Sequence, residues 1–422
     1  MLFALRSIIH TVFHSVSAAW FVFFKRRLVA AQPLTDPGER HDDDGIPVVH
    51  LRGSSYQRGY QHGVLCRDEL ARLQTLAWEY APQTATQRLG VPAWLSRILI
   101  KPLLRYLSAT YLSRVSADAK AEMQGLADGS GVPVADVVVN TLVWEVLAIF
   151  TAPKREHCSE VAISGAHTET GQSLLGYNYD VIVAGDRQVV EGFLALFVVS
   201  PQHGYPYVTP NVIGSIGINT AMNPHIAFGW DNTYLNAQAS RATQQGSYMV
   251  ALRDVALQCD SVATTFDRLR KEQRCESDIS VVIDASTVGV VELAGTVATL
   301  RDDPFAVWSA NQLTALRAFD RRDLANSRDQ RYTDLVASLT APVHIADVAR
   351  VLRDTGAPAH ERQIANPATT FAVIYDLAHG RLWIAFGGSP AVHQRLLCFD
   401  RHGNRYPEAD IPAIRLATLQ ET

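Results

Sequence analysis

The sequence predicts an α+β fold in which largely antiparallel sheets carry helices on their outer faces. Runs of β-branched and aromatic residues follow one another in adjacent pairs, as in hairpins, and do not alternate with helices as parallel βαβ units require. Helix-forming stretches lie between these pairs. The chain has 422 residues, of which 47% are hydrophobic and 19% charged, so it can bury a large core and is not a disordered chain.

The net charge and the cysteines indicate which partners and sites this protein is not expected to have. A net charge of −4 gives no reason to expect a nucleic-acid partner. The cysteines are odd in number and widely spaced, without a CxxC pair, so the sequence predicts neither a disulfide framework nor a zinc site. We expect no metal and no cofactor, and at least one free thiol. The five cysteines are Cys66, Cys158, Cys259, Cys275 and Cys398.

The N-terminus is apolar. Residues 7–24 contain no Asp, Glu, Lys or Arg and are followed at once by a basic cluster, residues 25–27. As a helix this run would span about 27 Å, slightly less than a bilayer core. An uncleaved anchor or interfacial helix, a cleaved signal peptide and a helix packed on the domain all remain open. We interpret residues 1–31 as a hydrophobic anchor or signal-like segment, expect membrane association through it on a side left open, and interpret residues 32–45 as an acidic linker.

Residues 46–157 are expected to form a mainly helical first region. Ile46–Leu51 is a β-branched run typical of a strand. Three glycines in residues 53–63 predict a Gly-rich loop that caps a helix beginning near Tyr56. Residues 91–116 read as a helix broken by Pro102. Its basic stripe suits either a solvated face or a lipid surface, and consists of Arg97, Lys101 and Arg105.

Two further helices lead to a polar loop. Ala117–Leu126 is helical and ends in a Gly-rich cap followed by Pro133. Val134–Phe150 is a long apolar helix. Residues 151–157 then form an exposed polar loop, the kind of segment where a chain is cut.

A hairpin follows that loop. Cys158 opens an alternating run that ends at Gly165, and after a turn at residues 169–172 a second short strand ends in the Asn178-Tyr179-Asp180 sequence. A single Cys is most often a small buried hydrophobe. At the start of a strand and opposite a polar pair, it is also placed to act as a nucleophile.

The rest of the chain is dominated by strands. Strand-like runs occupy residues 189–199, 213–219, 226–230, 280–284, 288–293, 305–310, 370–377 and 381–386. Helical stretches occupy residues 246–258, 260–272, 327–339 and 344–354.

Six blocks of this chain, taken in order, resemble the penicillin acyltransferase-like (C45-type) enzymes of the N-terminal nucleophile hydrolases, and more loosely choloylglycine hydrolases and acid ceramidase-like amidases. Together the blocks cover roughly residues 46–390. They are GSSYQRGYQHG (53–63), AEMQGLADGSGVPVADVVVN (121–140), HCSEVAISGAHTETGQSLLGYNYD (157–180), INTAMNPHIAFGWDN (218–232), WSANQL (308–313) and SRDQRY (327–332).

This resemblance implies an αββα sandwich, two antiparallel sheets face to face between helical layers. It also implies an inactive precursor that cleaves itself before the cysteine, which divides the chain into a first region, 46–157, and a catalytic region, 158–422. By position, Cys158 resembles the nucleophile, and its freed α-amine would be the base. Asp180 and Asn178 resemble the pair that orients the cysteine and its amine.

The same resemblance supplies three more site residues. Asn311 and the region of Asn232 resemble oxyanion-hole donors. Arg331 resembles the arginine that supports the nucleophile, with Arg328 as the alternative. The chain departs from the family at His157, where the penicillin acyltransferases usually have Gly, and a bulkier residue there bears on self-cleavage. Pro224 and His225 also replace the usual acidic and basic pair of the substrate loop.

The expected function is hydrolysis of a linear N-acyl amide, or transfer of its acyl group, through a thioester on Cys158. A free thiol titrates near about 8.5 and an α-amine near about 7.7–8, so the amine can take the thiol proton without a histidine. The apolar N-terminus and the basic stripe favour a lipid-like acyl group. Two alternatives stay open: a membrane-tethered, non-catalytic binding protein of the same fold, and an ester- or phospholipid-cleaving hydrolase with the same nucleophile.

Overall fold

The central strands of this protein are buried on both faces. In the computed structural model every residue of β4 (Leu174–Asp180), β9 (Ser277–Ile283) and β13 (Thr369–Asp376) is buried. Such strands need a covering layer on each side of their sheet. The structure describes residues 27–90, 92–112, 114–150, 158–181, 188–233, 247–272, 277–320, 328–356 and 363–414.

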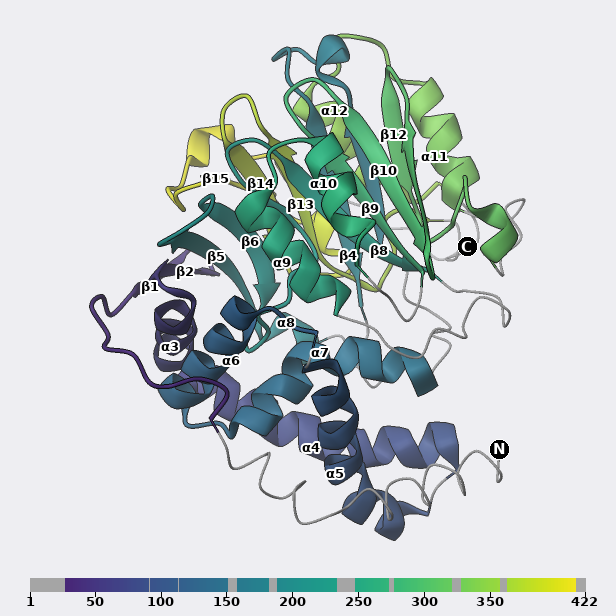
Figure 1. Ribbon diagram of the computed structural model, residues 1–422. Helices are drawn as coiled ribbons and strands as arrows, with labels where there is room; N and C mark the ends of the chain where they lie inside the picture. The colour runs from purple at the N-terminus through teal and green to yellow at the C-terminus, as the bar shows by residue number, and fades with distance from the viewer. Residues whose placement is uncertain are drawn as a thin grey trace, which may run out of the picture.

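Two sheets provide the framework (Figure 1). In spatial order the larger sheet has nine strands: β1 (Glu39–Asp43), β2 (Ile46–Gly53), β5 (Leu194–Pro201), β6 (Tyr207–Val212), β7 (Ala221–Met222), β8 (Ala227–Thr233), β9, β10 (Val288–Ala294) and β11 (Val297–Asp302). The smaller has six: β12 (Ala306–Ser309), β3 (Ser159–Ile163), β4, β13, β14 (Arg381–Phe386) and β15 (Leu397–Asp400). Neighbouring strands run antiparallel except β2 and β5, which are parallel.

Helices cover the outer face of each sheet. Beside the nine-stranded sheet lie α3 (Ser55–Leu65), α4 (Arg67–Leu89), α5 (Ala93–Leu112), α6 (Ala117–Ser130), α7 (Val134–Phe150), α9 (Tyr248–Gln258) and α10 (Val262–Leu269). Beside the six-stranded sheet lie α11 (Arg328–Ala337) and α12 (Ile345–Leu352). A short α8 (Gln188–Glu191) precedes β5.

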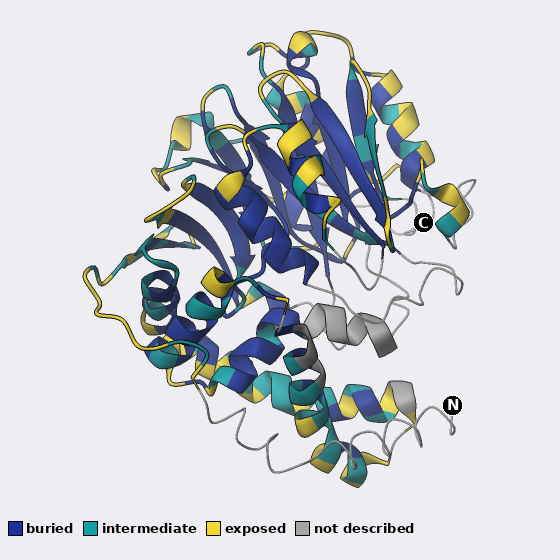
Figure 2. Cartoon of the chain, in the orientation of Figure 1, coloured by how far each residue is buried: buried dark blue, intermediate teal, exposed yellow. Residues whose placement is uncertain are grey.

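Three apolar clusters confirm the αββα layering. The first joins the first helical layer to the nine-stranded sheet, for example Leu126 of α6 with Phe197 of β5. The second lies between the sheets and includes Val281 of β9 and Phe371 of β13. The third joins the six-stranded sheet to α11 and α12. In Figure 2 the strands are mostly buried, whereas the helices expose their outward faces. The predicted α+β sandwich is therefore confirmed.

The Gly-rich stretch of residues 53–63 becomes most of α3, with Ser54 as its N-cap. Its glycines face α6 at very short range. A Cβ on Gly59 would lie 1.9 Å from the carbonyl oxygen of Glu122, and a Cβ on Gly125 would lie 2.0 Å from that of Tyr56. Only glycine permits this approach of two helix backbones. The spacing therefore encodes helix packing as well as the turn at Ser54.

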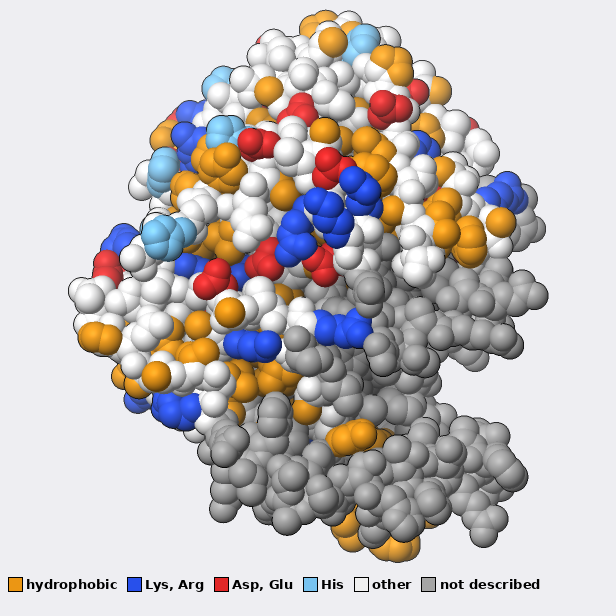
Figure 3. All heavy atoms as spheres, viewed as in Figure 1, with side chains coloured by type: hydrophobic (Ala, Val, Ile, Leu, Met, Phe, Trp, Pro, Cys, Tyr) orange, Lys and Arg blue, Asp and Glu red, His pale blue; other side chains and the backbone are white. Residues whose placement is uncertain are grey.

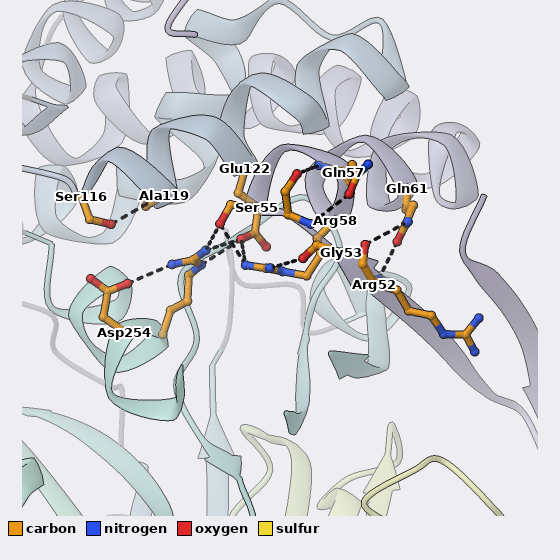
Figure 4. A network of polar contacts seen from close by, with 12 residues as sticks. Arg52, Gly53, Ser55, Gln57, Arg58, Gln61, Ser116, Ala119, Glu122 and Asp254 are labelled. Carbon is orange, nitrogen blue, oxygen red and sulfur yellow. Dashed lines mark hydrogen bonds and ion pairs between the residues drawn. The ribbon is translucent and has the colours of Figure 1, made fainter. Parts of the chain in front are cut away.

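A buried ion network ties α3 and α6 to α9, which lies beyond Cys158 in the chain (Figure 4). The Glu122 carboxylate of α6 accepts hydrogen bonds from Arg58 Nη2 at 3.1 Å and from Arg253 Nε at 3.0 Å. Arg253 lies on α9, is fully buried and also binds Asp254 at 2.9 Å. Three helices are thus joined by charges that have no access to water.

Several local expectations are wrong. Residues 213–219 are not a strand, because side chains satisfy their backbone: Asn211 Nδ2 donates to the carbonyl of Gly217 at 2.9 Å, and His62 Nε2 accepts from the amide of Gly214 at 3.1 Å. The run 189–199 begins as α8 and becomes β5 only at Leu194.

The helix at residues 91–116 is not broken by Pro102. α5 continues through it, packed against α4 and α7. A proline inside a helix costs about 3 kcal/mol, which burial of residues such as Leu104 offsets.

The stretch expected to be an acidic linker contains the edge strand β1, paired along β2. Through β2, residues 46–157 also share the nine-stranded sheet with β5. The residues before and after Cys158 therefore share one sheet and do not form separate cores.

Several of the predicted features lie outside the described residues. The apolar run 7–24, the loop 151–157 with His157, and Cys275 all lie there. Among the described helices, none combines the length and hydrophobicity that crossing a membrane requires. On the face seen in Figure 3, basic and acidic side chains are interspersed, in keeping with the small net charge.

Candidate active site

The hairpin of β3 and β4 places Cys158 at the edge of the space between the sheets. β3 begins at the next residue, and Ser159 lies directly opposite Asn178 of β4. Because side chains alternate along a strand, Ser159 faces the α12 side and Cys158 the opposite side. Cys158 there joins the apolar cluster between the sheets, with Tyr177 and Tyr179, and is 5% exposed.

One guanidinium connects three of the expected site residues. Arg328, the first residue of α11, donates from Nη2 to the Cys158 carbonyl at 2.8 Å and to Asn311 Oδ1 at 2.9 Å. Its Nη1 donates to Asp180 Oδ2 at 3.2 Å. All of these groups are buried. The planar fork of an arginine suits such simultaneous contacts, which a lysine cannot reproduce.

Asp180 has an unusual environment for a carboxylate. Its Oδ2 also accepts a hydrogen bond from Asn366 Nδ2, which the sequence analysis did not identify. Burial raises the pKa of Asp180 to about 7, although the Arg328 charge acts to lower it. Near neutral pH this group therefore changes its charge within hydrogen-bonding distance of Arg328.

Asn311 is held in a left-handed backbone conformation with φ of +66°. Asparagine adopts this region more readily than most residues. Its Nδ2 donates to the carbonyl of Asn232 at 2.9 Å and to Asn232 Oδ1 at 3.3 Å, and its backbone amide donates to Asp231 Oδ2 at 3.2 Å. The side-chain amide is thus oriented at both ends, by Arg328 on its oxygen and by Asn232 on its nitrogen.

Two expected residues lie elsewhere. Arg331 is one helical turn beyond Arg328, and this turn carries it away from the site to a bidentate pair with Asp354, at 2.8 and 2.6 Å. The arginine of this cluster is therefore Arg328, which corrects the expectation of Arg331. Asn178 donates to the carbonyls of Leu352 at 2.9 Å and Ile364 at 3.3 Å, so it fastens the end of α12 to β4 and does not contact Cys158.

The surroundings of Cys158 disfavour the charged form of its thiol. Burial raises its pKa well above the usual range, and the nearby carboxyl groups of Asp231 and Asp180 raise it further.

Sequence reasoning missed Asp231 and Glu160, which are both fully buried. The available signal was a carboxylate inside an otherwise apolar strand run, in SEVAI and in AFGWDNT. Buried carboxylates are rare unless they have a specific partner or role. Within the described part of the chain, no group of three or more His, Cys, Asp or Glu side chains is arranged to hold a metal ion.

Asp329, beside Arg328, gives a testable pH dependence. Neither of its carboxylate oxygens has a hydrogen-bond partner among the described residues, and burial raises its pKa to about 7. A carboxyl whose pKa is higher in the folded than in the unfolded state stabilises the fold at low pH and loses that contribution as pH rises from about 4 to about 7. For one such group, the free energy of unfolding falls by up to about 1.4 kcal/mol per pH unit in this range.

Asp329→Asn should therefore raise the melting temperature at pH 8, leave it unchanged at pH 4, and flatten the loss of stability between these values. Thermal unfolding across this pH range is the measurement. Asp334→Asn, which removes an exposed carboxylate from the same helix, is the control and should leave the pH profile unchanged. A destabilised Asp329→Asn variant at pH 8 would contradict the assignment.

The chain was also compared with known proteins. No protein-family model matches it. A curated relative, an uncharacterised protein of Archaeoglobus fulgidus, is 23% identical over 321 residues, which cover 72% of this chain and 49% of the relative. The chain thus spans about half the length of the curated relative that it matches.

Three solved structures are similar at low sequence identity. An N-acylethanolamine-hydrolyzing acid amidase ortholog of Caenorhabditis elegans matches with a TM-score of 0.40 and 12% identity over 52% of this chain and 93% of its own. A mutant conjugated bile acid hydrolase of Clostridium perfringens matches with a TM-score of 0.41 and 11% identity, over 62% of this chain and 100% of its own. Penicillin V acylase of Agrobacterium tumefaciens matches with a TM-score of 0.38 and 13% identity, over 57% of this chain and 86% of its own.

Proposed function

We propose that this chain is a precursor that cleaves itself before Cys158 and then cleaves a linear N-acyl amide, passing the acyl group to water or to an amine. The observation that carries the proposal is the Arg328 guanidinium, which binds the Cys158 carbonyl, Asp180 and Asn311 together. A site built around the backbone of one cysteine, with an amide and a carboxylate fixed beside it, suits nucleophilic acyl transfer.

Activation follows from the chemistry of the residue itself. The Cys158 sulfur attacks the carbonyl carbon of residue 157, the C–N bond breaks, and water hydrolyses the resulting thioester. The products are a carboxylate on residue 157 and a free α-amine on Cys158. That amine titrates near about 7.7–8, so it can take the thiol proton near neutral pH.

In the turnover step the thiolate attacks the substrate carbonyl and forms a tetrahedral intermediate. Asn311 Nδ2 is the donor proposed for its oxygen, together with the Asn232 region. The C–N bond then breaks, the leaving amine takes the proton held by the Cys158 amine, and a thioester remains. Water or an acceptor amine releases the acyl group. Asp180 is proposed to orient the Cys158 amine, since Arg328 holds it next to the Cys158 backbone.

A lipid-like acyl group is favoured by one surface feature. Trp94 and Ile98 lie about one turn apart on α5 and are 66% and 62% exposed. Exposed Arg97 stands between them in the sequence. Large apolar side chains beside a basic residue suit contact with a membrane surface or a micelle that carries the substrate.

Intact-mass analysis of the purified wild type and of Cys158→Ala tests the proposal. The wild type should give two fragments whose masses sum to the full chain plus one water, with a new N-terminus at Cys158. Cys158→Ala should stay uncut. An uncut wild type whose Cys158 resists acylation would overturn the proposal and favour a non-catalytic binding protein. Faster release from an ester than from the matched amide would favour an ester-cleaving hydrolase.

A further inference from the structure

The side chain of Glu160 crosses from one sheet to the other. It starts on β3, and its Oε2 accepts a hydrogen bond from the amide of Val281, on β9 of the nine-stranded sheet, at 2.9 Å. It passes over Gly229 of β8, where a Cβ would lie 2.8 Å from Glu160 Oε1 and 3.0 Å from the Tyr177 ring. Gly229 therefore leaves the space that the Glu160 carboxyl fills.

Asp231 shares this space. It lies two residues beyond Gly229 on β8, so the two residues point to the same face of the strand. Its Oδ2 accepts the Asn311 amide, whereas Oδ1 accepts no hydrogen bond from the described residues. Glu160 shows the same division, since Oε2 is bonded and Oε1 has no partner among the described residues. Each carboxyl thus has one satisfied and one unsatisfied buried oxygen.

Two fully buried carboxylates at one place cannot both be charged without a large electrostatic cost. A single proton shared between the pair removes one charge and supplies a donor for the unsatisfied oxygens. We propose that Glu160 and Asp231 form a carboxyl pair that holds one proton and thereby sets the charge next to Cys158. The role given to Cys158 rests on the proposed function; the proton-holding pair does not.

The electrostatics of the region support this pairing. Burial, and then the charge of Asp231, raise the pKa of Glu160 well above its usual range. Burial raises the pKa of Asp231 to about 7, against the opposing effect of Arg328. The other titratable or charged groups that act on the pair or on Cys158 come from β4 and α11. They are Tyr177, Asp180, Arg328 and Asp329.

The pair has a direct consequence for the nucleophile. After burial itself, the charge of Asp231 is the largest cause of the raised pKa of Cys158. The proton of the pair resides on Glu160, because the charge of Asp231 raises the pKa of Glu160, whereas Arg328 favours the charged form of Asp231. Asp231 is then the charged member of the pair, and its negative charge opposes ionisation of the Cys158 thiol. The pair therefore holds Cys158 in its neutral form, and we assign both carboxyls a positioning role.

The rate of Cys158 alkylation by iodoacetamide, followed by peptide mapping from pH 6 to 10, tests the pair. Asp231→Asn removes the nearby charge and should increase the rate at pH 7.5 by about tenfold, equivalent to one pKa unit. Glu160→Gln replaces a neutral carboxyl with a neutral amide that keeps a hydrogen-bond donor, and should leave the rate close to that of wild type. Asp278→Asn is the control. It removes a buried carboxyl on β9 that accepts a hydrogen bond from the Trp230 ring, and it should leave the alkylation rate of Cys158 unchanged.

An increase in Asp231→Asn alone supports the pair, whereas equal increases in both variants, or none in Asp231→Asn relative to Asp278→Asn, would overturn it. The buried Cys66, Cys259 and Cys398 report unfolding in the same peptide map. Should one variant fail to fold, infrared spectroscopy of a chain that carries Asp180→Asn and Asp329→Asn replaces the alkylation test, because these substitutions remove the bands of two other buried carboxyls. A remaining protonated-carboxyl band at pH 7 is expected, and its absence would overturn the pair. Neither readout requires a cut chain or a substrate, so failure of the pair is distinguishable from failure of the proposed function.

Discussion

Arg328→Gln is expected to prevent self-cleavage and to lower kcat for amide turnover by about 10²–10³, the size seen when an oriented donor of an acyl-transfer site is lost. The substitution removes three contacts at once, to the Cys158 carbonyl, Asp180 and Asn311. Without the cation, buried Asp180 loses the charge that lowers its pKa and should become protonated. Breaking a buried pair in this way also costs about 3–5 kcal/mol of unfolding free energy.

Arg331→Gln is the matched control, since it removes the same side chain one turn along the same helix. Its pair with Asp354 is one-third exposed on the arginine side and is worth at most about 1 kcal/mol. Processing by intact mass, kcat on a matched amide and urea unfolding should all stay close to wild type. Arg328→Lys should behave like Arg328→Gln in kcat, because an ammonium lacks the fork. Equal losses in the Arg328 and Arg331 variants would contradict the assignment.

Arg253→Met should destabilise the protein by about 3–5 kcal/mol, because it leaves the buried Glu122 carboxylate with Arg58 as its remaining charged partner. Burial alone would raise the pKa of the Glu122 carboxyl, and the charge of Arg253 is the largest effect that keeps this pKa low. Figure 4 shows Glu122 among the charged groups of α3, α6 and α9. Urea unfolding of the uncut Cys158→Ala chain, with and without Arg253→Met, measures the difference.

The Glu122–Arg253 ion pair would have a second role in a processed chain. Glu122 precedes the proposed cleavage site and Arg253 follows it, so their contact would hold the two fragments together after the peptide bond is lost. Glu122→Met combined with Arg253→Met should recover much of the stability, since two apolar groups replace a buried pair at little cost. Arg268→Met is the control, because Arg268 is partly exposed and also binds Asp254. If Arg268→Met lowered the free energy of unfolding as much as Arg253→Met, the loss could not be assigned to the buried Glu122 carboxylate.

The local pattern of the chain was sufficient for most elements. The hairpins of β9 with β10 and of β13 with β14 follow from paired β-branched runs separated by turn residues. The Ser54 cap of α3 follows from local chemistry as well, whereas the glycines within α3 are explained only by the close approach of α6. Residues 213–219 show the limit, because their apolar pattern suits a strand but side chains of Asn211 and His62 bind the backbone instead.

The sequence by itself determined that Cys158 stands at the start of a strand, with Asp180 at the end of the next one and Asn311 after a later strand. These are consequences of short-range periodicity, which fixes where an element begins and which face a residue takes. Only the tertiary structure decided between Arg328 and Arg331. Two arginines three residues apart share nearly the same helix face, and the packing of α11 against β12 selects the one at the helix start. Tertiary structure alone also brought Glu160 to Asp231, since their meeting depends on two sheets packing face to face across 71 positions of sequence.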